Sequence, residues 1–330
     1  MYLKKVLFSF LFFYAINLSS QTCCSGGIPL SNNIGLPLLE KGTLQLGLNY
    51  DYNNLNTLNN GTERLDDNSR LRITHSILLN SSYAISDNFS VESLLTWVNQ
   101  RRNISQFGNE NLDQTTGVGD AVLLFKYDVT KFFPKLIGKN SSLQIGLGTK
   151  IPLGSSTEEN DQGITLNADL QPGSNAWDAI FLSSFSSNFN IRPSLSYTIR
   201  AIYRSTGTNN SYFENTTYKF GNEFQAFLSF SDQFTFFKTL INPSISFKYR
   251  EAQIDQIGGF DLDNTGGNWL FVIPNFSINI SPNLTFSTKA ELPLYSQVDG
   301  TQLTPTYRIT SGLLFKIKPK KLLPNLNETL

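Results

Sequence analysis

Residues 43–52 read TLQLGLNYDY, and apolar and polar side chains alternate through the whole stretch. Its apolar members are Leu44, Leu46, Leu48, Tyr50 and Tyr52, and the residues between them are polar or glycine. Successive side chains of a β-strand point to opposite faces, so this stretch predicts a strand with one apolar and one polar face.

The same alternation recurs along the chain and predicts an all-β protein. Strands of a soluble sandwich are usually about 5 to 6 residues long, whereas a strand that crosses a bilayer at a tilt needs about 9 to 11. The alternating segments are of the longer kind, which favours a membrane barrel over the alternative of a soluble β-sandwich. We predict twelve strands, near residues 43–53, 69–85, 88–99, 119–129, 142–153, 176–187, 190–204, 218–231, 240–251, 268–280, 284–296 and 305–317.

The connectors between these segments support the same fold. Short turns on one side and long loops on the other are typical of an outer-membrane barrel, with the short turns facing the periplasm. We therefore expect a transmembrane antiparallel up-and-down β-barrel of about 12 strands over residues 42–318, set in the lipid of a bacterial outer membrane. The tight turns are at residues 85–88, 187–190 and 280–284, and the long polar loops at 53–68, 99–118, 153–175, 204–217 and 251–267.

The N-terminus carries the pattern of an exported protein. A basic start at residues 1–5 precedes an apolar run at 6–18 and two small residues, Ser19 and Ser20, which predicts a signal peptide over residues 1–20. The run is shorter than the roughly 20 residues of a spanning helix. Residues 21–41 then form a periplasmic or lumen segment, and residues 319–330 a tail after the last strand. The alternative to cleavage after Ser20 is that the leader is removed before Cys23 and a lipid is attached to this cysteine.

Composition excludes several other classes of protein. Lys plus Arg and Asp plus Glu both number 26, so the formal net charge is zero and no overall basic field attracts nucleic acid. We expect no nucleic-acid partner. The chain has one His and two Cys, too few for a metal centre built on these ligands.

Charged residues fall mainly on the polar parity of the predicted strands, where Arg and Lys outnumber Asp and Glu. Inside a barrel such residues face water or pair across the lumen. They either solvate and plug the interior or guide a ligand through it. The residues that we expect to line the pore are Arg70, Arg72, Glu92, Asp120, Lys126, Arg192, Arg200, Arg204, Glu223, Lys248, Arg250, Lys289, Glu291 and Arg308.

Candidate chemical motifs do not assemble into a site. Nucleophilic catalysis needs a base within reach of the nucleophile, but Ser76, next to the single His75, points to the opposite face, and the residue two beyond is Ile77. The stretch at residues 261–266 imitates a calcium loop, but its twelfth position is Val272 rather than Glu. We expect no enzyme activity, no cofactor and no metal.

Residues 117–127, GVGDAVLLFKY, resemble the Gly-x-Gly-Asp strand opening of outer-membrane transporters of the phenol meta-pathway type, distant relatives of hydrophobic-compound channels. The start CCSGGIP at residues 23–29, with Ser19, Ser20 and Gln21 before it, is similar to barrels of Bacteroidetes. The resemblance implies passage of small, aromatic or apolar molecules. Many barrels end on an aromatic residue, whereas this chain continues after its last predicted strand with a tail at residues 319–330.

These observations predict an outer-membrane channel or transporter for small molecules, with a lumen lined by an excess of Arg and Lys. The alternative is a structural or adhesive barrel that does not transport and presents acidic surface loops. Conductance separates the two. The sequence leaves the solute and the oligomeric state open.

Overall fold

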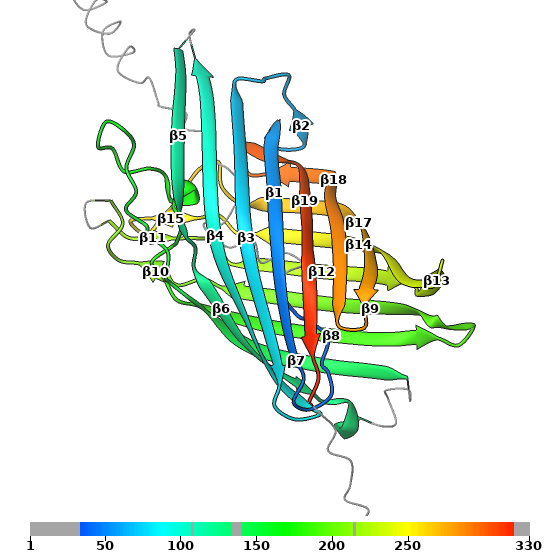
Figure 1. Cartoon of the computed structure of the whole chain (residues 1–330). Helices are drawn as coiled ribbons and strands as arrows, with labels where there is room; N and C mark the ends of the chain where they lie inside the picture. Colours follow the sequence, from blue (N-terminus) through cyan, green and yellow to red (C-terminus); the bar gives the residue numbers. More distant parts are fainter. Residues whose placement is uncertain (1–33, 107–108, 134–139, 214–215, 320–330) are drawn as a thin grey trace, which may run out of the picture.

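The computed structural model describes residues 34–106, 109–133, 140–213 and 216–319, and these residues form a closed antiparallel barrel of twelve long strands (Figure 1). The predicted signal peptide and residues 320–330 lie outside the described residues. The barrel closes between its first and last strands, β1 and β19, whose pairing runs from Leu44 opposite Ile317 to Asn60 opposite Thr301.

Neighbouring strands are also neighbours in the chain, which is the up-and-down order that the sequence predicts. The segments β5 and β6 count as one strand, interrupted at residues 119–120, because both pair with β4. The strands are β1 (Leu44–Asn60), β3 (Arg70–Ala84), β4 (Phe89–Gln106), β5 with β6 (Asn109–Val118 and Ala121–Asp128), β7 (Ser141–Ile151), β8 (Asp178–Phe189), β9 (Arg192–Ser205), β12 (Glu223–Ser231), β14 (Thr239–Ala252), β17 (Gly267–Ser281), β18 (Leu284–Val298) and β19 (Thr301–Ile317).

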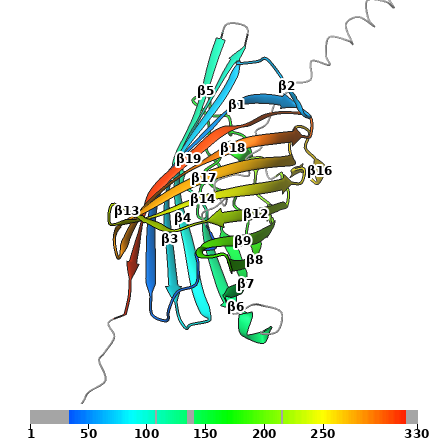
Figure 2. The ribbon, with the colours of Figure 1, turned by 90° about the vertical axis from the view of Figure 1, so that its right-hand side faces the viewer.

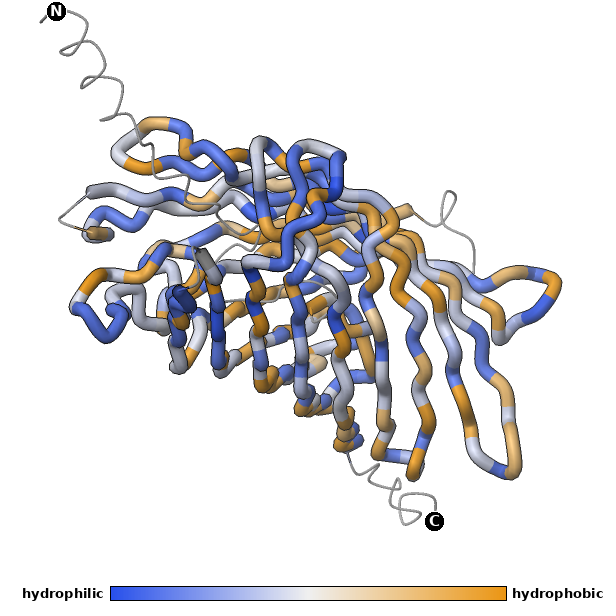
Figure 3. Tube along the Cα trace, turned by 90° about the horizontal axis from the view of Figure 1, so that it is seen from above, coloured by the Kyte–Doolittle hydropathy of each residue, from blue (hydrophilic) through white to orange (hydrophobic). Residues whose placement is uncertain are grey.

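Alternation along the strands sorts side chains between the two faces of the wall, and Figure 3 shows apolar and polar positions alternating along the trace. Leu48 and Leu147 point outward with exposed fractions of 55% and 58%. Gln45 and Asp51, on the other parity of β1, are buried inside. A wall that exposes its apolar side and buries its polar side suits lipid outside and a polar interior.

One predicted loop is wrong, because residues 99–118 form a hairpin instead. The outer half of β4 pairs with β5 from Trp97 opposite Val118 to Gln106 opposite Asn109, and the hairpin extends beyond the neighbouring strands (Figures 1 and 2). Both sides of this hairpin are polar, so alternating hydropathy does not mark it. Its inner side carries the ion pair of Arg102 with Asp113, at 2.7 Å.

The predicted strand at residues 218–231 is divided. A Cβ at Gly221 would lie 1.8 Å from the carbonyl oxygen of Gln253, so the chain crosses a neighbour too closely there for any other residue. The wall strand β12 begins after this crossing. The residues before it form β11 (Tyr218–Lys219), which joins β10 (Thr208–Asn209), β15 (Gln256–Ile257) and β16 (Phe260–Asp261) in a small separate sheet at the long-loop end.

Short elements complete the described part of the chain. β2 (Glu63–Arg64) pairs with β1, and β13 (Phe234–Phe236) pairs with β14. The 3-10 helix η1 (Thr130–Phe132) lies in a connector at the short-turn end, and η2 (Ala168–Leu170) lies in the loop between β7 and β8.

Among the described residues, no helix has both the length and the apolar character needed to cross a membrane.

The middle of the lumen is filled by an apolar layer. Buried residues from β3, β4, β6, β8, β9, β12, β17 and β18 make one contiguous cluster there, and Ile34 from the segment before the barrel belongs to it. Ion pairs lie on both sides of this layer, and hydroxyl side chains gather on its short-turn side. Its wall members include Leu78, Leu94, Leu124, Ile180, Phe227 and Phe271.

Candidate functional site in the barrel interior

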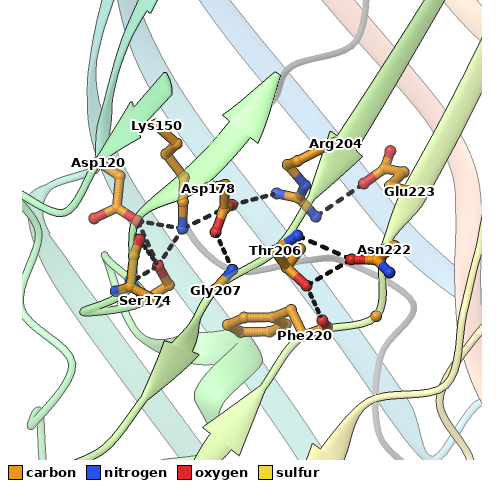
Figure 4. Close-up of polar contacts among 12 residues, drawn as sticks. Asp120, Lys150, Ser174, Asp178, Arg204, Thr206, Gly207, Phe220, Asn222 and Glu223 are labelled. Atoms are coloured by element: carbon orange, nitrogen blue, oxygen red, sulfur yellow. Dashed lines mark hydrogen bonds and ion pairs between the residues drawn. The ribbon is translucent and has the colours of Figure 1, made fainter. Parts of the chain in front are cut away.

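The outer half of the lumen holds a chain of buried ion pairs (Figure 4). The Nζ atom of Lys150 lies 3.0 Å from Asp120 Oδ2 and 3.1 Å from Asp178 Oδ2. Asp178 also faces Arg204, which donates to Glu223 at 3.0 Å. Each charge is buried, and a buried charge is tolerated only when it is paired and hydrogen-bonded. The network therefore links neighbouring strands, from the β5–β6 strand to β12, along one side of the inner face of the wall.

The loop between β7 and β8 folds into the barrel and joins this network. Asp120 accepts hydrogen bonds from the backbone N–H of Ser174 at 3.0 Å, from its hydroxyl at 2.8 Å and from the N–H of Gly154 at 3.2 Å. Farther toward the outer end of the wall, Arg72 pairs with Asp169 of the same loop at 2.9 Å. The loop therefore caps the interior instead of standing in solvent.

Sequence reasoning missed Asp169, which it placed in an acidic surface loop. The side chain is buried with Arg72, and no alternation marks this loop residue as an inner one. Lys150 and Asp178 are also absent from the predicted pore-lining set, although both occupy the polar parity of their strands. Their place in the network shows that the alternation of polar and apolar residues along the strands was enough to predict that both side chains point inward.

The segment before β1 lies inside the lumen and is held on two sides. The backbone N–H groups of Gly35 and Leu36 donate to the two carboxylate oxygens of Glu92, at 2.9 and 3.1 Å. Glu92 pairs with Lys126 at 2.7 Å, and the Lys126 ammonium donates to the carbonyl oxygen of Leu36. From the opposite wall, Arg200 Nη1 donates to the carbonyl oxygen of Ile34 at 2.7 Å.

A cavity of about 510 Å³ lies beyond this segment, at the short-turn end of the barrel. Gly35, Pro37 and Leu38 of the inner segment form part of its lining, together with Arg200 and Lys289. Most of the remaining lining consists of small hydroxyl side chains from five wall strands, among them Ser142, Ser186, Thr198, Ser229, Ser231 and Ser246.

The other predicted pore-lining residues take various positions. Arg70 is half-buried near the outer end of β3, and Arg192 lies at the short-turn rim, where it is 53% exposed and 3.1 Å from Asp232. The rest form ion pairs on the inner face: Lys248 with Glu291 at 2.9 Å, Arg250 with Glu223 at 2.9 Å, and Arg308 with Asp51 at 2.8 Å. The excess of basic residues is thus largely matched by carboxylates, one of them supplied by the inward loop.

Residues considered for catalysis and metal binding lie apart from the interior site. His75 is on the outer face, where its Nδ1 is 2.6 Å from the hydroxyl of Tyr50, whereas Ser76 is buried inside. Within the described ranges there is no cluster of three or more His, Cys, Asp or Glu residues that could hold a metal ion.

Comparison with solved structures identifies the fold as that of outer-membrane β-barrels. An outer-membrane channel from Pseudomonas putida F1 is similar with a TM-score of 0.66 and 13% sequence identity, over 88% of this chain and 100% of that one. The β domain of the Bordetella autotransporter BrkA gives 0.47 and 8%, over 84% and 100%. The KdgM porin gives 0.41 and 10%, over 82% and 99%. No protein-family model and no curated protein sequence matches the chain.

Proposed function

We propose that the chain is an outer-membrane channel for small molecules whose path is closed in this structure by two of its own segments. The observation that carries the proposal is how the lumen is filled. The inner segment at residues 34–38 and the loop between β7 and β8 block it through hydrogen bonds and ion pairs to the wall. Both can move without breaking the hydrogen-bonded ladders that close the barrel.

The charge distribution supports passage of anions. In the outer half, wall cations such as Arg72 and Lys150 are paired with carboxylates. At the short-turn end, Arg200 and Lys289 line a cavity whose described lining holds no Asp or Glu. Low-dielectric walls focus the field of such residues onto the path, which favours ions of opposite sign.

The resemblance of residues 117–127 to phenol meta-pathway transporters implies an aromatic or apolar solute. Two of the residues that carry that resemblance hold the inward loop in place here. Asp120 accepts hydrogen bonds from the loop, and a Cβ at Gly117 would lie 3.3 Å from Pro172 of the loop. The cavity lining is mostly polar. For this chain we therefore favour a hydrophilic solute.

Planar-bilayer recording of the purified full chain tests the proposal. In a salt gradient we expect discrete openings and a reversal potential displaced toward the anion equilibrium value. The absence of any conductance over the whole voltage range would contradict the proposal. It would favour the alternative, a structural or adhesive barrel, with which the hydrogen-bonded interior is also consistent.

A further inference from the structure

We infer that the cavity at the short-turn end is a binding site for a small carboxylate that carries several hydroxyl groups. This inference deepens the proposed function by naming the class of solute. It rests on three properties of the cavity: its hydroxyl lining, its charge and its size.

The hydroxyl lining offers many weak hydrogen-bonding partners. Ser186 and Thr198 are paired across two strands at 2.9 Å, and Ser229 and Ser246 at 2.7 Å. A hydroxyl has one donor and two acceptor sites, so each pair keeps the capacity to bond a further group. No aromatic side chain is among the described residues of the lining, so the cavity has no surface for stacking an aromatic solute.

The charge of the lining is positive. Arg200 and Lys289 are its charged members among the described residues, and none of its residues is Asp or Glu. Arg200 is fixed in orientation, because its guanidinium lies 5.1 Å from the ring centroid of Phe227 while one nitrogen bonds the Ile34 carbonyl. A planar guanidinium held in this way suits an oxyanion such as a carboxylate, since its fork of donors matches two oxygens.

The size of the cavity fits a small molecule. Its volume of about 510 Å³ lies within the range of roughly 300–1,000 Å³ that is usual for ligand sites. Arg200 and the inner segment meet at the cavity, since both line it and a Cβ at Gly35 would lie 3.0 Å from Arg200 Nη1. A bound carboxylate would therefore sit against the segment that blocks the lumen.

Calorimetry on the full chain in detergent micelles tests the site with three probes. Gluconate carries both a carboxylate and hydroxyls, glucose carries hydroxyls alone, and hexanoate carries a carboxylate alone. We expect gluconate to bind about tenfold more tightly than either of the others, because each lacks one set of charge-assisted or neutral hydrogen bonds. Equal affinity for gluconate and glucose, or for gluconate and hexanoate, would overturn the assignment.

Variants locate the binding. Lys289→Gln and Arg200→Gln should each weaken gluconate binding about tenfold. Arg101→Gln removes an exposed cation of the outer hairpin and should leave the affinity unchanged. Because Arg200 also holds the inner segment, the double variant Ser229→Ala/Ser246→Ala supplies an independent test: it keeps the charge and should reduce the preference for gluconate over hexanoate. An unchanged preference in a folded double variant would contradict the hydroxyl-rich site.

The outcome for the site is separable from that for the channel. Conductance without gluconate binding would overturn the site and leave the channel standing. Gluconate binding without conductance would support the site and contradict the channel.

Discussion

Arg200 donates a hydrogen bond to the carbonyl oxygen of Ile34 at 2.7 Å, although the two residues are 166 positions apart in the chain. Glu92 holds the next two residues from the facing wall. The inner segment is therefore fixed by a few polar contacts of its backbone at Ile34, Gly35 and Leu36 and by the side chain of Ile34 in the apolar layer. Such contacts can be removed one set at a time while the wall stays intact.

The buried outer network should be costly to break. The substitution Asp120→Ala removes one of the carboxylates that pair with the ammonium of Lys150. It also removes the acceptor of three hydrogen bonds from the inward loop. Loss of one partner of a buried ion pair costs about 3 to 5 kcal/mol, and we expect a loss of this size in the free energy of unfolding. Urea unfolding in micelles, followed by tryptophan fluorescence, measures it.

The matched control is Arg192→Gln, which breaks an ion pair at the exposed rim. Exposed pairs contribute up to about 1 kcal/mol, so the change should stay below that value. If both variants lost the same stability, the outer network would not be the stabilising element that its burial indicates.

The outer face of the wall should tolerate charge only beyond the bilayer. Leu147→Arg places a cation on the outward side of β7, at a position with an exposed fraction of 58%. At the middle of a bilayer such a change costs about 2 to 4 kcal/mol. Leu153→Arg, at 55% exposure but past the end of the strand, is the control and should cost much less. Equal costs from folding titrations in lipid vesicles would contradict the membrane belt.

The small sheet at the long-loop end should respond to pH through Asp255. Burial raises the pKa of the Asp255 carboxyl above its ordinary value, although hydrogen bonds from the N–H of Gly221 and the hydroxyl of Tyr218, both at 2.7 Å, oppose the shift. The folded sheet thus favours the protonated acid. Its contribution to stability is complete below the unfolded pKa and is lost as the pH rises through the raised folded pKa.

Hydrogen exchange of the backbone around residues 217–222, corrected for its intrinsic pH dependence, measures this effect. We expect protection to fall as the pH rises past the ordinary carboxyl range, and Asp255→Asn to flatten the profile. Protection that increases with pH would show that the ionised carboxylate is the favoured form.

Alternation predicted the wall because lipid imposes it. Leu44 to Tyr52 face outward on every second position, and the same rule placed Arg72, Glu92 and Lys126 inside. Outside the bilayer, alternation of apolar and polar residues no longer marks a strand. The hairpin of β4 and β5 is polar on both sides, so its register is evident only from the structure, in pairs such as Arg102 with Asp113.

Contacts between distant segments were beyond the reach of the sequence. Periodicity says which face a strand residue occupies, but it does not say which loop enters the barrel. Asp169 therefore read as a solvent-facing residue, and the anchoring of Gly35 by Glu92 depends on a backbone N–H that no side-chain pattern reveals. The hydroxyl-lined cavity likewise arises only when short-turn ends of several strands meet.

Single-channel recording of the double variant Glu92→Gln/Lys126→Met tests the central claim, that the inner segment is one of the two segments that close the path. The two changes neutralise a buried pair together, which avoids an unpaired charge, and they weaken the anchors of Gly35 and Leu36. The control Arg102→Met/Asp113→Asn neutralises a buried pair in the outer hairpin, away from the segment. We expect the open probability to rise in the first variant and to stay at the wild-type level in the second. Equal open probability in all three folded proteins would contradict the claim.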